Sequence, residues 1–256
     1  MRCVLFISGL VGFLLLSTAN AIVINVPADY PTIEAGINAS VNGDTVLVAP
    51  GTFQENVNFN GHSIVLASNF IVTCDTSQIS STIIDGRDYG ATITINQGED
   101  STTHIMGLSI TGGSSSGIRA INASVSIKNS IIRGNLAGAG DGGGLNLQGG
   151  AFEISDNIVS NNAARQGGAI WLQSCTADVD HNLITYNSSF GVGAGLLAYD
   201  CTGLSIHNNT ICNNDHSGDN TGALYSVYNA VCLQTNLDTL YLNLRDTFSI
   251  SKSFRF

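Results

Sequence analysis

An internal repeat constrains this chain more than any other feature of its sequence. Two apolar residues separated by one residue return at steps of 27, 25 and 27 residues, as Val125 and Ile127, Phe152 and Ile154, Ala177 and Val179, and Leu204 and Ile206. Each pair is followed at a fixed distance by Ser or Asn, an aliphatic residue, a further Asn and a glycine turn. A period of this length is typical of a solenoid, in which each repeat is one coil.

The pattern inside each repeat indicates how a coil is built. Every second residue is apolar over short stretches, as in a strand with one buried face. Gly and Asn lie between the stretches and tolerate the positive φ of tight corners. The sequence therefore predicts an all-β, single-stranded parallel β-helix of about seven or eight coils, with stacked Asn side chains at its corners. An antiparallel sandwich also uses short strands, but it does not require this register.

The composition agrees with a β fold and excludes other classes. Hydrophobic residues make up 43% of the chain and charged residues 11%, which fits neither a disordered chain nor a helical bundle. The formal net charge is −10, so nucleic acid and anionic membrane surfaces are not expected as partners, because both are polyanionic.

Four regions are expected along the chain. Residues 1–21 have the charged start, apolar run and small-residue exit of a signal peptide, which predicts a protein secreted or held at the cell surface, without a membrane span after cleavage. Residues 22–42 predict an N-terminal strand and a capping helix over 31–42. Residues 43–227 are expected to form the parallel β-helix, and residues 228–256 an irregular last coil or tail, or the end of a truncated chain. An open strand edge there would favour end-to-end self-association.

Several motifs between residues 26 and 226 resemble a known family. They are Val-Pro-Ala-Asp-Tyr-Pro-Thr-Ile at 26–33, Gly-Asp-Thr-Val at 43–46, Pro-Gly-Thr-Phe-Gln-Glu at 50–55, Thr-Ile-Ile-Asp-Gly at 82–86, and the later Asn and Gly-Gly-Ala-Ile lines. These motifs look like those of secreted right-handed parallel β-helix proteins of the pectin-lyase-like superfamily. The resemblance implies a right-handed coil and an association with polysaccharide, whereas the fold alone does not specify an activity.

The resemblance does not extend to catalytic motifs. Residues 51–55 are similar to the Gly-x-Tyr-x-Glu opening of pectin methylesterases, with Phe53 in place of Tyr. The later Gln-Asp-Thr, Asp-Phe-x-Phe-Gly and Arg-Pro-Trp stretches of those esterases are missing from the sequence, as are polygalacturonase-type motifs. No catalytic residue is therefore identified, and the residues on which acid/base chemistry could draw are Arg119, Glu153, Asp178 and Asp180.

Strand alternation predicts an aromatic and amide face on the outside of the coil. An aromatic ring can stack on the C–H surface of a sugar while amides bond its hydroxyls. The alternative is that Trp171 lies under a loop or on solvent without any binding role. The predicted ligand-binding residues are Trp171, Tyr225, Tyr199, Asn146, Gln148 and Gln173.

A second outward face is predicted to carry Glu153 beside Asp178, with Lys128, Ser155, Asp180 and His207 in the next column. Carboxylates on neighbouring coils can hold Ca²⁺ or share a proton, and a solvated polar face explains the same residues. No resident cofactor or metal is expected, and calcium is the ion that this face would favour.

Cys175 and Cys201 are predicted to occupy equivalent corners of neighbouring coils, 26 residues apart. Their Cα atoms would then lie about 5 Å apart, which a disulfide can span. A buried ladder of unbonded thiols is the alternative.

Two hypotheses from different functional classes follow. The first is a non-catalytic, exported β-helix that binds polysaccharide or surface glycan, or serves as a cell-surface scaffold or adhesin module. The second is a polysaccharide-active enzyme, namely a lyase, hydrolase or esterase.

Overall fold

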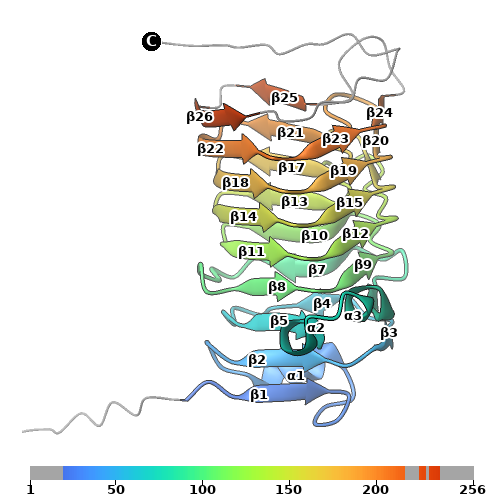
Figure 1. The fold of residues 1–256 in the computed structure, drawn as a ribbon, viewed down its shortest axis with the longest axis vertical. Coiled ribbons are helices and arrows are strands. Elements are labelled where there is room, and N and C mark those ends of the chain that lie inside the picture. Colours follow the sequence, from blue (N-terminus) through green and yellow to red (C-terminus); the bar gives the residue numbers. More distant parts are fainter. Residues whose placement is uncertain (1–19, 217–224, 229–230, 237–256) are drawn as a thin grey trace, which may run out of the picture.

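Each full coil contributes one strand to each of three parallel sheets, so the chain winds into a parallel β-solenoid of about seven turns (Figure 1). This computed structural model describes residues 20–216, 225–228 and 231–236. The predicted all-β parallel β-helix is confirmed. Most of the predicted signal peptide and of the irregular tail lies outside the described residues, and in the described part no helix is long and apolar enough to cross a membrane.

Three long sheets and one short sheet run along the stack. Sheet A comprises β1 (Val23–Val26), β2 (Thr45–Val48), β5 (Val65–Ser68), β8 (His104–Met106), β11 (Val125–Lys128), β14 (Ala151–Ser155), β18 (Thr176–Asp180), β22 (Thr202–His207) and β26 (Val231–Asn236). Sheet B comprises β3 (Gly51–Phe53), β6 (Thr82–Asp85), β9 (Ser109–Thr111), β12 (Ile131–Arg133), β15 (Ile158–Ser160), β19 (Leu183–Thr185) and β23 (Thr210–Cys212). Sheet C comprises β4 (Val57–Asn58), β7 (Ala91–Ile95), β10 (Ser116–Ile121), β13 (Leu145–Gln148), β17 (Ile170–Gln173), β21 (Leu196–Tyr199) and β25 (Tyr225–Tyr228). Sheet D comprises β16 (Ala163–Ala164), β20 (Ser188–Ser189) and β24 (Asp215–His216).

The core is a set of aliphatic columns inside the coil. Ile154 lies opposite Val179, which lies opposite Ile206, and all three side chains are buried. Such stacking follows from the register, because an alternating strand presents the same residue position to the inside in every coil. For these three coils, the predicted repeat alignment is therefore correct at the level of individual residues.

Asparagine ladders hold two of the corners. Between sheets A and B, the side-chain amide of Asn157 donates to Asn182 Oδ1 at 3.0 Å, and that of Asn182 donates to Asn209 Oδ1 at 3.0 Å. A second ladder between sheets B and D contains Asn135, Asn162, Asn187 and Asn214. Each side chain thus replaces backbone pairing that the corner interrupts, as the sequence predicted.

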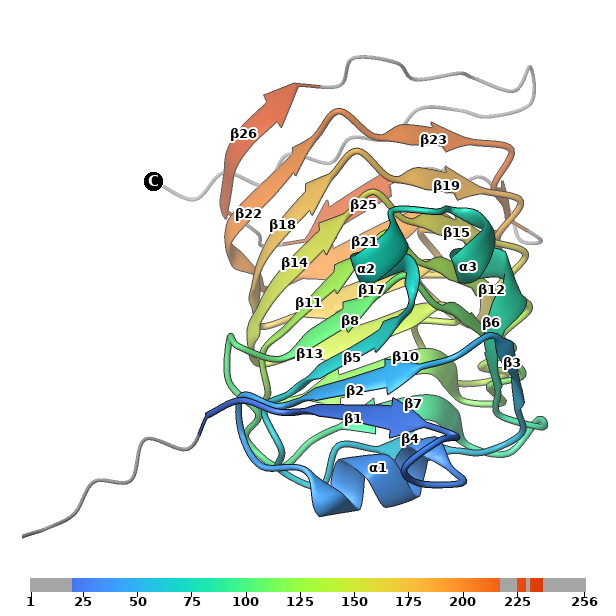
Figure 2. The ribbon, with the colours of Figure 1, turned by 60° about the horizontal axis from the view of Figure 1, so that its bottom comes forward.

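The N-terminal end of the stack is covered by α1 (Ile33–Ala39), which lies alongside β1 and β4 (Figure 2). The helix is shorter than the predicted 31–42, because extended Thr32 caps its start by accepting from the Ala35 N–H, and extended Ser40 ends it. The Glu55 carboxylate accepts the N–H groups of Ile33 and Glu34, both at 3.0 Å, which satisfies donors that a helix start leaves open. Two short helices, α2 (Phe70–Thr73) and α3 (Ser77–Ser81), lie between β5 and β6.

Candidate functional site

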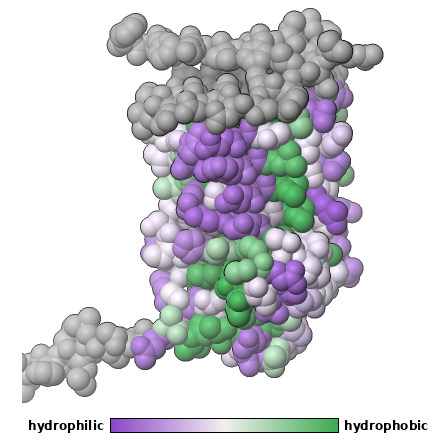
Figure 3. Space-filling model, in the orientation of Figure 1, coloured by the Kyte–Doolittle hydropathy of each residue, from purple (hydrophilic) through white to green (hydrophobic). Residues whose placement is uncertain are grey.

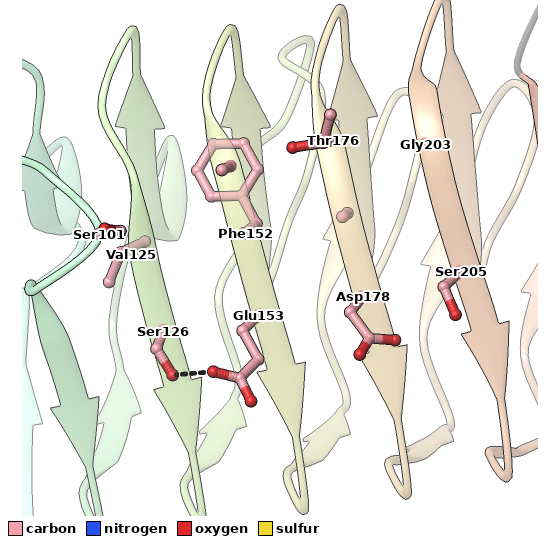
Figure 4. Close-up of a pocket in the computed structure, with 11 residues that line it drawn as sticks. Ser101, Val125, Ser126, Phe152, Glu153, Thr176, Asp178, Gly203 and Ser205 are labelled. Atoms are coloured by element: carbon pink, nitrogen blue, oxygen red, sulfur yellow. Dashed lines mark hydrogen bonds between the residues drawn. The ribbon is translucent and has the colours of Figure 1, made fainter. Parts of the chain in front are cut away.

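The outer face of sheet A carries a row of polar side chains across four neighbouring coils (Figure 4). This carboxylate row consists of Ser126 on β11, Glu153 on β14, Asp178 on β18 and Ser205 on β22. The predicted placement of Glu153 beside Asp178 is confirmed by the pairing of β14 with β18. The row lines a hollow of about 380 Å³, whose rim includes Ser101, Ala151, Thr176 and Gly203.

A parallel row, two residues further along the same strands, contains Lys128, Ser155, Asp180 and His207. Lys128 forms an ion pair with Glu153. His207 contacts two carboxylates, since its Nε2 lies 3.0 Å from Asp178 Oδ1 and its Nδ1 lies 2.8 Å from Asp180 Oδ1. The two rows therefore form one network of charges, and Figure 3 shows a hydrophilic band on this side of the molecule.

The surroundings of Glu153 and Asp180 favour ionised carboxylates. A hydrogen bond from Lys128 lowers the pKa of Glu153, with a smaller contribution from the Ser126 hydroxyl. Burial acts to raise the pKa of Asp180, but hydrogen bonds from His181 and Asn208 outweigh it and the pKa is lowered. The same contact with Asp180 raises the pKa of His181. At neutral pH the rows therefore present negative charge and hydrogen-bond acceptors.

The predicted aromatic face is not an exposed platform. Trp171 and Asn146 point outward from sheet C, yet they are only 6% and 8% exposed. Glycine-rich connections lie against this column, so that a Cβ added to Gly167 would come within 3.0 Å of the Trp171 Cβ. Within the described residues, the buried Trp171 indole N–H has no hydrogen-bond partner. Trp171 therefore packs beneath a connecting segment, which was the alternative to an exposed aromatic platform.

The other members of that predicted face have different positions. Tyr225 pairs with Leu196 on the backbone, one position away from the column of Trp171 and Leu197, and its side chain lies outside the described residues. Gln148, Gln173 and Tyr199 share one column at the ends of their strands. Both glutamines are half-buried and Tyr199 is 36% exposed, so this column remains accessible beside the corner that leads to sheet A.

The residues considered for acid/base chemistry fall on two sheets. Arg119 is half-buried on sheet C, between Thr94 and Asn146, whereas Glu153, Asp178 and Asp180 lie on sheet A. The structure therefore does not assemble all four into one site. Across the described ranges, no group of three or more His, Cys, Asp or Glu residues is arranged to hold a metal ion.

A family model described as "Right handed beta helix region" matches residues 91–232, which is more than half of the chain. This chain belongs to the right-handed β-helix family. No curated protein sequence matches the chain. The right-handed parallel β-helix that the resemblance implied is confirmed.

Three solved structures are similar to this chain. A mutant pectin methylesterase in complex with a hexasaccharide has 13% identity and a TM-score of 0.50, covering 83% of this chain and 70% of that one. A pectin methylesterase from Aspergillus niger has 14% identity and a TM-score of 0.44, with 85% and 86% covered. An alginate lyase from Paenibacillus has 14% identity and a TM-score of 0.33, with 87% and 98% covered. At 13% identity, the likeness to the first of these structures shows the fold alone.

Sequence reasoning missed two roles in this β-helix protein. His207 was assigned to the correct column, but its contacts with Asp178 and Asp180 were not foreseen. They follow from the register, since a residue can reach the next coil both directly and diagonally. Glu55, which belongs to the esterase-like segment, caps α1 instead of facing the carboxylate row.

Proposed function

We propose that this β-helix protein is an exported module that binds a neutral or amino-sugar glycan along the carboxylate row without cleaving it. The observation that carries the proposal is the row itself, which offers one hydrogen-bonding side chain per coil over an open hollow. Successive coils lie about 4.8 Å apart, a repeat similar in length to one unit of an extended sugar chain. A glycan lying along the stack would thus meet a new hydroxyl or carboxylate at each unit.

The charge of the site supports this choice of glycan. Glu153, Asp178 and Asp180 contribute three carboxylates, against which Lys128 provides one fixed positive charge. The whole chain also has a formal net charge of −10. An acidic polysaccharide would be repelled here, whereas neutral hydroxyls can donate to the carboxylates and a protonated amino sugar would also be attracted.

The surroundings of Glu153 and Asp180 do not favour either residue as the acid of a glycosidase. A glycosidase needs one carboxyl group that stays protonated near its working pH, and such a group has a raised pKa. Glu153 and Asp180 have lowered pKa values. The enzyme hypothesis has one observation in its favour, namely that His207 is oriented by two carboxylates, as a general base would be.

Binding to immobilised glucosamine oligomers, neutral cello-oligomers and polygalacturonate, with and without Ca²⁺, tests the proposal. We expect glucosamine oligomers to bind best, and Asp178→Asn to weaken them about tenfold through loss of one charge-assisted hydrogen bond. Asp88→Asn is the matched control, because Asp88 is exposed between β6 and β7 with φ of 56°, which Asn also adopts. Equal binding by the two variants, or preferential binding of polygalacturonate, would contradict the proposal.

The same incubations separate binding from catalysis. New reducing ends, unsaturated products or released methanol would favour the enzyme hypothesis over a binding module. Export is part of the proposal and rests on residues 1–21. Mass spectrometry of the secreted protein is expected to find a mature chain that begins at Ile22.

A further inference from the structure

Two cysteines stack at the corner between sheets C and A. Cys175 lies between β17 and β18, and Cys201 lies between β21 and β22. The preceding residues, Ser174 and Asp200, share a left-handed backbone with φ of 49° and 53°. The Thr202 N–H donates to the Cys175 carbonyl at 2.9 Å, which continues the backbone pairing through the corner. The two corners are therefore equivalent in geometry.

The thiols of this pair are in contact. The two Sγ atoms lie 3.2 Å apart, and the residues are 3% and 0% exposed. Stacked positions on neighbouring coils are separated by about 4.8 Å, which lies within the usual Cα separation of disulfides, about 4.4–6.8 Å. Forming a bond of about 2.05 Å thus requires side-chain rotation without movement of the coils.

We propose that Cys175 and Cys201 form a disulfide between neighbouring coils when the protein folds in an oxidising compartment. The other cysteines with described side chains are placed differently, since Cys74 is exposed and Cys212 contacts Thr185. Among the cysteines with described side chains, Cys175 and Cys201 are therefore the two whose positions allow a disulfide.

The bond forms by exchange with a small-molecule disulfide such as oxidised glutathione. The Cys201 thiolate attacks one sulfur of that disulfide and releases one thiol, and the Cys175 thiolate then attacks Cys201 Sγ and releases the second. The protein loses two electrons and two protons, and the small disulfide becomes two thiols.

Burial determines when this exchange takes place. Because neither thiol is accessible in the folded coil, the small disulfide has to react before the coil that contains Cys201 docks on its neighbour. Once closed, the bond would fix the rim of the hollow, since Thr176 follows Cys175 directly and Gly203 lies two residues after Cys201. It would also resist separation of these coils, which in a solenoid depends on contacts between neighbours.

The test is to refold the full chain in oxidised and reduced glutathione, block free thiols under denaturing conditions, and map the products by mass spectrometry. Chymotrypsin is the suitable protease, because no Lys or Arg lies between residues 165 and 245 whereas Tyr186 and Phe190 lie between the two cysteines. We expect a cross-linked pair of peptides that contain Cys175 and Cys201. Recovery of both cysteines as alkylated thiols, or a cross-link of either to another cysteine, would overturn the proposal.

A stability measurement provides a second readout. The bond closes a loop of about 26 residues, so a reducing agent is expected to lower the thermal midpoint of the oxidised wild type by about 10 °C. The double variant Cys175→Ala/Cys201→Ala should show no such response, and Cys212→Ser, the matched control, should retain it. A wild type that does not respond to reduction would contradict the proposal, even if every variant folds.

Discussion

Replacing Asn182 by Ala tests whether the asparagine ladder holds the coil together. The Asn182 amide nitrogen donates to Ile154 O at 2.7 Å, to Asp180 O at 2.9 Å and to Asn209 Oδ1 at 3.0 Å. Its Oδ1 accepts from the backbone N–H and the side-chain amide of Asn157, both at 3.0 Å. The side chain is thus central to a buried network that spans three coils.

The expected loss of stability in Asn182→Ala follows from the hydrogen-bond donors that lose their acceptor. In Asn182→Ala, the Asn157 backbone N–H and one of its two amide hydrogens lose the partner that the structure gives them. A buried donor without a partner costs about 1–3 kcal/mol. We therefore expect a loss of about 3 kcal/mol, or about 6–12 °C in the thermal midpoint of a domain of this size.

Thermal unfolding followed by circular dichroism measures this loss, and hydrogen exchange at the Asn157 amide locates it. Asn161→Gly is the control, because Asn161 is exposed at a nearby corner and its φ of 55° suits glycine. Asn182→Ser should fall between them, since Ser130 fills the equivalent position two coils earlier, where its hydroxyl accepts the Leu108 N–H at 3.3 Å. If Asn182→Ala lost less than about 1 kcal/mol, or no more than the control, the ladder would not have the proposed role.

Two further variants test the packing of the corners and the charge network. Gly150→Ala should destabilise the fold by about 2 kcal/mol or more in a denaturant titration, because the new Cβ would lie 1.8 Å from the Ala123 carbonyl oxygen. Gly51→Ala is the control and should change the stability little, because the nearest atom to its new Cβ is 3.5 Å away. Lys128→Met should raise the pKa of Glu153 toward its ordinary value of 4.5, as a carboxyl NMR titration would detect. Since the pKa of Glu153 is lowered in the folded protein, the contribution of Lys128 to stability is present above pH 4.5 and is lost as the pH falls through the lowered pKa, so the two proteins should converge in acid.

Most of the fold could be predicted because the same sequence pattern recurs in successive coils of a solenoid. The aligned positions Ile154, Val179 and Ile206 identified the core column, and the aligned asparagines identified the ladder. The same alignment correctly placed Glu153 beside Asp178. Each of these predictions depends on a register that several coils specify together, so that one irregular residue does not change it.

The aromatic face could not be predicted by alternation alone. Alternation shows that Trp171 points out of the coil, but not that a connecting segment returns over it. The relevant signal was the glycine four residues earlier, because Gly142, Gly167 and Gly193 precede Asn146, Trp171 and Leu197 at that same spacing. At these positions the chain passes too close to the sheet for a side chain.

The register prediction also failed at the last coil. The sequence placed Tyr225 on the same outward face as Trp171, yet β25 pairs Tyr225 with Leu196, one position away from the column of Trp171. The β22–β26 pairing contains register shifts as well. A single extra residue in one coil moves every later side chain to the opposite face, which a repeat alignment detects only when further coils follow.

The connections between the sheets differ in how much change they would accept. In the four coils from β11 to β23, the connections between sheets A and B are two residues long, at 129–130, 156–157, 181–182 and 208–209. The connections from sheet B to sheet C in the same region are longer and run over 134–144, 161–169 and 186–195. The connections from sheet B to sheet C differ in length while the asparagine ladders stay in register, so a foreign peptide could be inserted there. The exposed tip at residues 138–140 would display such an insert, with the remaining coils acting as a rigid mount.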